Sequence, residues 1–258
     1  MGLYLSKEYF SDPLRPQRIP LSGHSAMQAL YRAEVIDSYR QLVQISAPNR
    51  LARGTVKYLP NLYPVHKVLN HSASWPHGQV VWMDPDSDKG LPHTRPPNLI
   101  CIPTNISESS LTSTILHEQV HISQRIYPSQ WSKILETAWS MTPWTGDLPE
   151  DILLRRRINP DLVLGPTFQW KGDWVPVAIF KSLTSPILND VDIVWWQIST
   201  RSIHRQAPPG WEDYFGPVDN GHEHPYELSA YMIEKDNSTT TAYKELKTYL
   251  KDLPPTEL

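Results

Sequence analysis

Apolar residues recur at helical spacing in two long segments of this sequence. The first covers residues 24–46, where an apolar stripe faces polar positions such as Arg32 and Glu34. The members of this stripe are Met27, Leu30, Tyr31, Ile36, Tyr39, Leu42 and Val43. The second covers residues 111–126, contains no Gly or Pro, and ends before Pro128, because proline disfavours helical geometry in the residue before it. The pattern predicts one core-packing helix for each segment.

Shorter patterns predict the remaining elements. The expected strands cover residues 79–83, 99–102, 168–175 (a hairpin turning at 171–173), 177–180 and 192–198. The expected short helices cover residues 129–140, 150–157 and 241–250. Residues 47–78 and 199–221 show no regular pattern. We therefore expect an α+β protein in two lobes: residues 1–127 with a small mixed sheet and the 111–126 helix, and a mostly helical C-terminal lobe, residues 128–258.

The 111–126 helix carries His117-Glu118-Gln119-Val120-His121, an HExxH pattern. Residues at positions i and i+4 share one helix face, so both imidazoles can reach one metal ion. The glutamate can then take a proton from a metal-bound water. The pattern predicts His117 and His121 as metal ligands and Glu118 as a general base. The alternatives are two buried structural histidines, or a metal-free globular protein in which the pattern arises by chance.

A third ligand is expected, because a catalytic zinc ion commonly has three protein ligands and a water. Pro225 suits the first turn of a helix. Glu227 then lies early in that helix, with Ala230 one turn later on the same face, where a small side chain allows close packing. Glu227 is therefore the expected third ligand, and the neighbouring His222 and His224 are its rivals.

Together these residues resemble the gluzincins, zinc peptidases whose third ligand is a glutamate in a Glu-x-x-Ala arrangement. More narrowly, the second half of the chain resembles HExxH proteins of large DNA viruses and microbial eukaryotes. The elements that carry this resemblance are His117-Glu118-Gln119-Val120-His121, Gln124-Arg125, Pro128, Asn159-Pro160-Asp161 and His224-Pro225-Tyr226-Glu227 with Ala230. The resemblance implies a zincin-like fold in one catalytic domain. It also implies one Zn²⁺ ion held by His117, His121 and Glu227, and metallopeptidase chemistry on a peptide or protein substrate.

The chain departs from that group at Tyr231, where an acidic residue is expected. A carboxylate that orients a ligand histidine must then come from elsewhere, and Glu234, Asp161 and Glu223 are the candidates. The oxyanion that develops during hydrolysis also needs a donor. The candidates for that donor are Tyr226, Tyr231, His222, His224 and Arg157. Arg157 closes the densest cationic run of the chain, and the alternative for it is a place on a solvated face.

The expected function is a zinc metallopeptidase in which Glu118 activates a water and passes its proton to the leaving amine. A zinc amidohydrolase acting on a non-peptide amide would use the same residues. A zincin-derived binding or structural protein, such as a virion component, would hold the metal without turnover. The intact Glu118 argues against that last alternative, because a site without turnover has no need of a base.

Net charge and cysteine content limit the kinds of partner and the redox compartment that we expect. With 24 Lys and Arg against 27 Asp and Glu, the net charge is −3, which gives no reason to expect a nucleic-acid partner. The one cysteine, Cys101, excludes an intramolecular disulfide and fits a reducing compartment. Because Cys101 lies in the predicted strand 99–102, we expect a buried structural thiol.

The N-terminal residues match the N-myristoylation pattern, with Gly2 as acceptor and Ser6 as the hydroxyl residue. A single acyl chain would give only marginal, reversible membrane binding. The alternative is an ordinary N-terminal arm. Residues 1–10 lack the cationic segment and apolar run of a secretion signal, and no window matches a membrane-spanning helix. We expect an intracellular protein, cytoplasmic or virion-borne, without a transmembrane segment.

Overall fold

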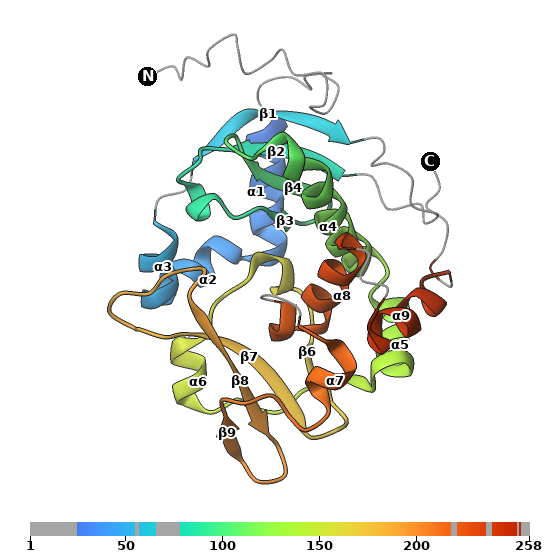
Figure 1. The fold of residues 1–258 in the computed structure, drawn as a ribbon. Helices are drawn as coiled ribbons and strands as arrows, with labels where there is room; N and C mark the ends of the chain where they lie inside the picture. The colour runs from blue at the N-terminus through green and yellow to red at the C-terminus, as the bar shows by residue number, and fades with distance from the viewer. Residues whose placement is uncertain are drawn as a thin grey trace.

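Two β-sheets and the helices that pack on them make up the described part of the chain. The computed structural model describes residues 25–54, 57–65, 78–217, 221–235, 239–251 and 253 (Figure 1). The α+β class expected from the sequence is confirmed. The predicted acylation site at Gly2 lies outside the described residues. Within the described ranges, no helix is both long and apolar enough to cross a membrane.

The first sheet is mixed and lies in the N-terminal half of the chain. Its strands are β1 (Tyr58–Val65), β2 (Gly78–Met83), β3 (His93–Arg95) and β4 (Leu99–Pro103), in the order β1-β2-β4-β3. β2 and β4 are parallel, whereas the other neighbours are antiparallel. The strands predicted at residues 79–83 and 99–102 are thus confirmed. β1 was not predicted, because two prolines interrupt its alternation of apolar and polar residues.

Helices cover both faces of this sheet. On one face, α1 (Ser25–Asp37) packs through Ala26, Ala29, Leu30 and Ala33 against Val81, Met83, Leu99 and Cys101. On the other face, α4 (Glu108–Ile126) packs through Leu111, Ile115 and Ile122 against Val80, Trp82, Ile100 and Ile102. Alternate residues of β2 and β4 therefore face different helices, as expected for strands buried on both sides. The predicted buried thiol of Cys101 is confirmed.

The single helix predicted over residues 24–46 is wrong. The chain forms α1, then α2 (Tyr39–Ile45) and α3 (Ala47–Arg53). Ser38 breaks the helix with a left-handed φ of 51°, and the Asp37 carboxylate accepts a hydrogen bond from the Tyr39 N–H at 3.0 Å. Asp37 is itself held by Arg95, whose Nε donates to it at 2.6 Å. The hydrogen bond from the Tyr39 N–H to the Asp37 side chain thus replaces a bond within the helix. Arg95, which is distant in the sequence, holds Asp37 in the position that makes this possible.

The predicted apolar stripe of this segment is also only partly buried. Leu30, Tyr39 and Val43 are buried, but Met27 and Tyr31 are 58% and 73% exposed. The face of α1 that meets the sheet is made mostly of alanines, which allow a close approach. The larger apolar side chains of α1 consequently lie on other faces of the helix.

The second sheet is antiparallel and lies in the C-terminal half. Its strands are β5 (Met141–Trp144), β6 (Thr167–Trp170), β7 (Trp174–Phe180), β8 (Val191–Gln197) and β9 (Ser202–His204), in chain order. The predicted hairpin is confirmed: Trp170 pairs with Trp174, and Lys171 and Gly172 in the turn have φ of 50° and 73°. The expectation of a mostly helical C-terminal lobe is wrong, because this sheet accompanies the helices there.

The remaining helices are α5 (Pro128–Trp139), α6 (Glu150–Arg155), α7 (Trp211–Phe215), α8 (Pro225–Glu234), α9 (Thr241–Leu250) and the 3₁₀ turns η2 (Ser87–Gly90), η3 (Pro160–Leu162) and η4 (Gly221–Glu223). Of these, α5, α7, α8 and α9 pack around an aromatic core. The largest side chains of this core are Trp131, Trp139, Trp170, Trp195, Trp211 and Phe215. Leu116 and Val120 of α4 belong to the same core. α4 is therefore anchored in two cores, which makes it a rigid platform.

Candidate metal centre

Two packed helices bring the predicted ligands together. α4 presents His117 and His121, and α8, which packs against α4, presents Glu227 in its first turn. The start of α8 is fixed locally by Pro225 and by His224, whose Nδ1 accepts a hydrogen bond from the Tyr226 N–H at 3.1 Å. All three predicted ligands are buried. Local start signals and helix packing thus position the two halves of the site.

The side chains of the three predicted ligands converge in what we call the ligand triangle, with Glu227 approaching each histidine through a different carboxylate oxygen. The Nε2 atoms of His117 and His121 are 3.1 Å apart. Oε2 of Glu227 lies 3.4 Å from Nε2 of His117, and Oε1 lies 3.5 Å from Nε2 of His121. Tetrahedral zinc with bonds of about 2.0–2.2 Å requires ligand atoms about 3.3–3.5 Å apart. The donor set and its spacing therefore fit a zinc ion.

Hydrogen bonds behind the histidines decide which nitrogen faces the site. The Nδ1 of His121 lies 2.8 Å from Oε1 of Gln124. The Gln124 Nε2 donates to the carbonyl of Tyr226 at 3.0 Å and to Oγ of Ser229 at 2.9 Å, which fixes the orientation of the amide. His121 must therefore donate from Nδ1, and its Nε2 lone pair points into the triangle. This is the arrangement that ligand histidines use.

His117 has an equivalent partner in Glu234. Its Nδ1 lies 3.0 Å from Oε2 of Glu234, near the C-terminal end of α8. Of the three carboxylates considered for this role, Glu234 is the one in contact with a ligand histidine. Burial opposes the charged form of His117, but hydrogen bonds that its ring donates to the Glu227 and Glu234 carboxylates raise its pKa well above the usual value. Protons and a metal ion therefore compete for this ring.

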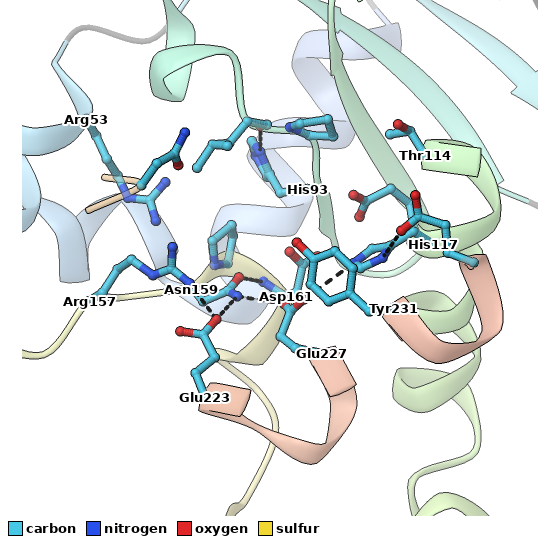
Figure 2. Close-up of a pocket in the computed structure, with 16 residues that line it drawn as sticks. Arg53, His93, Thr114, His117, Arg157, Asn159, Asp161, Glu223, Glu227 and Tyr231 are labelled. Carbon is cyan, nitrogen blue, oxygen red and sulfur yellow. Dashed lines mark hydrogen bonds and ion pairs between the residues drawn. The ribbon is translucent and has the colours of Figure 1, made fainter. Parts of the chain in front are cut away.

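Asn159 orients the third ligand. Its Nδ2 donates to Oε1 of Glu227 at 2.7 Å and to Oε1 of Glu223 at 2.8 Å, while its Oδ1 accepts from the Asp161 N–H at 3.0 Å (Figure 2). The sequence singled out Asn159 only as part of a shared set of residues, without a role. No local pattern could have indicated it, because Glu227 lies in a distant helix.

Glu118 lies beside the triangle and lines the cavity described below. It is buried, and its Oε2 has no hydrogen-bond partner among the described residues. Burial, together with the nearby charge of Asp161, raises the pKa of Glu118 to about 8, so that without a metal ion the carboxyl holds a proton at neutral pH. A cation bound at the triangle would lower this pKa and free the carboxylate. Asp161 is held in place by the N–H and Oγ1 of Thr94, both at 2.6 Å from its Oδ1. An unpaired carboxylate oxygen beside a metal site is chemically suited to accept a proton.

A cavity of about 310 Å³ opens onto the site. His117, Glu227 and Tyr231 line it at one side, and Arg53 and Arg157 line it on the side away from His117 (Figure 2). Glu118 also lines the cavity. The Tyr231 ring packs edge-on against His117, with centroids 4.5 Å apart. Burial and the nearby carboxylates raise the pKa of Tyr231, so its hydroxyl keeps its proton. Among the described residues, no group forms a hydrogen bond with that hydroxyl.

Two other candidate donors to the oxyanion, Tyr226 and Arg157, already form other contacts. Tyr226 packs against Phe168 in the aromatic core and does not line the cavity, and burial raises its pKa to about 12. Arg157 lines the cavity, but its Nη2 contacts Oε1 of Glu223 at 2.6 Å and its Nη1 donates to the Leu188 carbonyl at 3.1 Å. Arg157 is therefore buried and paired rather than part of a solvated face.

The two rival histidines also lie away from the triangle. His224 donates from Nε2 to the Pro166 carbonyl at 2.9 Å, while its Nδ1 caps α8, so both nitrogens are in use. Burial lowers the pKa of His224 to about 4. His222 accepts a hydrogen bond from Nε1 of Trp211 at 2.7 Å. The structure thus brings Glu227, and neither histidine, to His117 and His121.

Comparison of the chain with protein-family models, with curated proteins and with solved structures finds no match in any of the three. The geometry of the site therefore carries the functional argument.

Proposed function

We propose that this protein is a zinc-dependent peptidase, with His117, His121 and Glu227 as the metal ligands. The observation that carries the proposal is the ligand triangle, in which the two histidine Nε2 atoms are 3.1 Å apart and Oε2 and Oε1 of Glu227 lie 3.4 and 3.5 Å from those of His117 and His121. In it, the lone pair of His121 is directed inward by Gln124. Two imidazole nitrogens and a carboxylate oxygen converging at this spacing are suited to zinc. A bound zinc ion would supply an acidified water and a Lewis acid for the scissile carbonyl.

In this proposal Glu118 is the general base. Its unpaired Oε2 accepts a proton from the attacking water, and the same carboxyl group then delivers that proton to the leaving amine. Burial supports the role, because a carboxylate without other partners keeps its lone pairs for the reacting atoms. The nearby Asp161 disfavours a second negative charge and so eases the return of the proton.

Tyr231 is the proposed donor to the developing oxyanion. It lines the cavity next to His117, and its hydroxyl is protonated and without another partner among the described residues. A donor aimed at the place where charge develops stabilises the transition state more than the ground state. Tyr231, which stands where an acidic residue is expected, therefore has a proposed role in stabilising the oxyanion.

Metal content is the first test of the proposal. We expect about one zinc per chain by elemental analysis of the purified protein. His117→Ala and Glu227→Ala should lose it, while His204→Ala, a change in β9 outside the site, should keep it. Glu118→Gln should keep zinc but lose hydrolysis in a screen of peptide substrates. Absence of zinc from the wild type after reconstitution would overturn the proposal.

The same experiment separates the alternatives. Zinc bound without any hydrolysis of peptides or small amides would favour a non-catalytic binding or structural protein. Hydrolysis confined to non-peptide amides, and lost in Glu118→Gln, would favour an amidohydrolase that uses the same residues.

A further inference from the structure

Two buried guanidinium groups line the cavity with an unused donor each. The Nε atoms of Arg53 and Arg157 are buried and have no hydrogen-bond partner among the described residues. The side chains of Arg53 and Arg157 are only 3% and 10% exposed. Both residues line the cavity that opens onto the metal site, on the side away from His117 (Figure 2). Buried charged donors without partners are rare in proteins, and they mark places where a ligand completes the hydrogen bonding.

Both guanidinium groups are held rigidly by their other nitrogens. Arg53 donates from Nη2 to the Ile158 carbonyl, and its Nη1 lies 3.4 Å from Oδ1 of Asp88. Arg157 uses Nη1 and Nη2 for Leu188 and Glu223. Neither side chain needs to be ordered when a ligand arrives, which favours binding.

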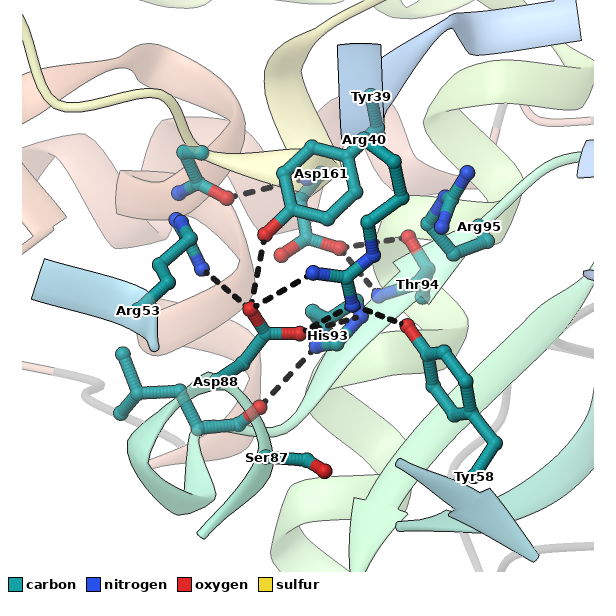
Figure 3. A network of polar contacts seen from close by, with 12 residues as sticks. Tyr39, Arg40, Arg53, Tyr58, Ser87, Asp88, His93, Thr94, Arg95 and Asp161 are labelled. Carbon is teal, nitrogen blue, oxygen red and sulfur yellow. Dashed lines mark hydrogen bonds and ion pairs between the residues drawn. The ribbon is translucent and has the colours of Figure 1, made fainter. Parts of the chain in front are cut away.

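Charge at this end of the cavity also favours an anion. Asp88 is fully buried and shared by two arginines, because Nη2 of Arg40 lies 2.8 Å from its Oδ2 while Arg53 contacts its Oδ1 (Figure 3). One carboxylate therefore faces two guanidinium groups, and Arg53 is not fully neutralised.

The neighbouring strand edge has one backbone donor already in use. β3 is the last strand of its sheet, and such an edge can bind an extended peptide. Here the N–H of Thr94, the middle residue of β3, already donates to Oδ1 of Asp161 at 2.6 Å. A substrate therefore cannot use this N–H while Asp161 holds it.

We propose that Arg53 and Arg157 form a subsite for a carboxylate group of the substrate. The inference rests on the proposed hydrolase function, because the carboxylate belongs to the molecule whose amide bond is cleaved. Guanidinium groups bind carboxylates through charge-assisted hydrogen bonds, which are stronger than neutral ones. The carboxylate can come from the C-terminus of a short peptide or from an acidic side chain. In either case its position in the cavity sets which amide bond meets Glu118.

The test follows the arginine Nε–H signals by NMR in full-length protein labelled with ¹⁵N-arginine. The probes are N-acetyl-trialanine with a free carboxylate and the same peptide as its C-terminal amide. The free acid should shift the signals of Arg53 and Arg157 and bind at least tenfold more tightly than the amide. The signal of Arg155, which donates to the Phe180 carbonyl and does not line the cavity, should stay unchanged. Lysine substitutions at positions 53, 155 and 157 assign the signals.

A second pair of probes distinguishes the two sources of the carboxylate. N-acetyl-Ala-Glu-Ala-amide should bind like the free acid if the subsite takes an acidic side chain, whereas N-acetyl-Ala-Gln-Ala-amide should not. Preference for the free acid alone would assign the subsite to a C-terminal carboxylate.

The comparison of acid and amide uses the wild type, so it does not depend on the folding of a variant. Equal affinities for all probes, or arginine signals that never move, would overturn the subsite even if zinc-dependent hydrolysis is observed. Repeating the titration after metal removal tests whether the carboxylate of the probe binds zinc directly instead of the arginines. Affinity that disappears with the metal, without a shift at Arg53 or Arg157, would also overturn it. Shifted arginine signals in a protein without turnover would retain the carboxylate site and reject the peptidase proposal.

Discussion

Gln124 joins His121 to the backbone of the neighbouring helix. Its amide oxygen accepts from Nδ1 of His121 at 2.8 Å, and its amide nitrogen donates to the Tyr226 carbonyl at 3.0 Å. His121, a proposed ligand on α4, is therefore oriented by the first turn of α8, the same turn that carries Glu227. Movement of one helix relative to the other would disturb two ligands at once.

Replacement of Gln124 by leucine should weaken zinc binding. Loss of a partner behind a ligand histidine typically costs 10- to 100-fold in metal affinity, because the tautomer and the ring orientation are no longer fixed. Competition with a chromophoric chelator would measure the affinity. Gln169→Leu, in strand β6, provides a matched control. Equal zinc affinity in the Gln124→Leu variant and the wild type would contradict the orienting role.

Replacement of Asn159 by alanine should affect both the metal and the fold. The variant leaves Glu223 and Glu227 without a shared amide donor, so we expect a stability loss of about 1–3 kcal/mol. We also expect zinc affinity to fall about 10-fold or more. Chemical denaturation with and without zinc would measure both effects. A variant that loses stability but binds zinc as tightly as the wild type would limit Asn159 to a structural role.

Removal of the Tyr231 hydroxyl should slow turnover. Tyr231→Phe keeps the ring that packs on His117 but removes the proposed donor, so kcat should fall about 10²- to 10³-fold with little change in KM. Tyr226→Phe is the matched control, since Tyr226 lies in the aromatic core and does not line the cavity. Steady-state kinetics on a peptide found in the screen would measure kcat and KM for both variants and the wild type. Unchanged kcat in Tyr231→Phe would assign oxyanion stabilisation to another group.

Protonation of His224 should destabilise the protein in mild acid. Burial lowers its pKa from 6.5 to about 4, and its Nδ1 must stay unprotonated to cap α8. The unfolded chain therefore binds a proton more readily than the folded one. This contribution, about 3 kcal/mol, is complete above pH 6.5 and is lost as the pH falls toward 4.

Unfolding free energies measured between pH 4 and pH 7 would check the His224 prediction. His224→Asn keeps a side chain that can cap the helix but does not titrate. It should therefore show a shallower pH dependence in this window. Parallel curves for the wild type and His224→Asn would show that another group governs stability in acid.

Local signals predicted the helices of the site well. Pro128 ends α4, Ser107 caps its start, and Pro225 begins α8, and each acts within a few residues of its own position. The i, i+4 spacing placed His117 and His121 on one face for the same reason. These features depend on backbone geometry and nearest neighbours, which a single sequence contains.

Features fixed by distant contacts could not be predicted. The break at Ser38 depends on Asp37, which is held by Arg95 from strand β3. Tyr226 and Tyr231 look equally suited to the site in the sequence, yet only packing decides that the first joins the core and the second faces the cavity. The role of Asn159 likewise arises only when η3 meets α8.

Arg157, Glu223, Asn159 and Glu227 form a continuous chain of hydrogen bonds, with successive separations of 2.6, 2.8 and 2.7 Å. Under the two proposals above, an anion bound by Arg157 would alter its hold on Glu223, and this change would pass through Asn159 to Glu227, the proposed metal ligand. Binding at the two ends is thereby coupled, and thermodynamic linkage makes the coupling reciprocal. Whatever factor a carboxylate imposes on zinc affinity, zinc must impose on carboxylate affinity, so the occupancy of each end reports on the other.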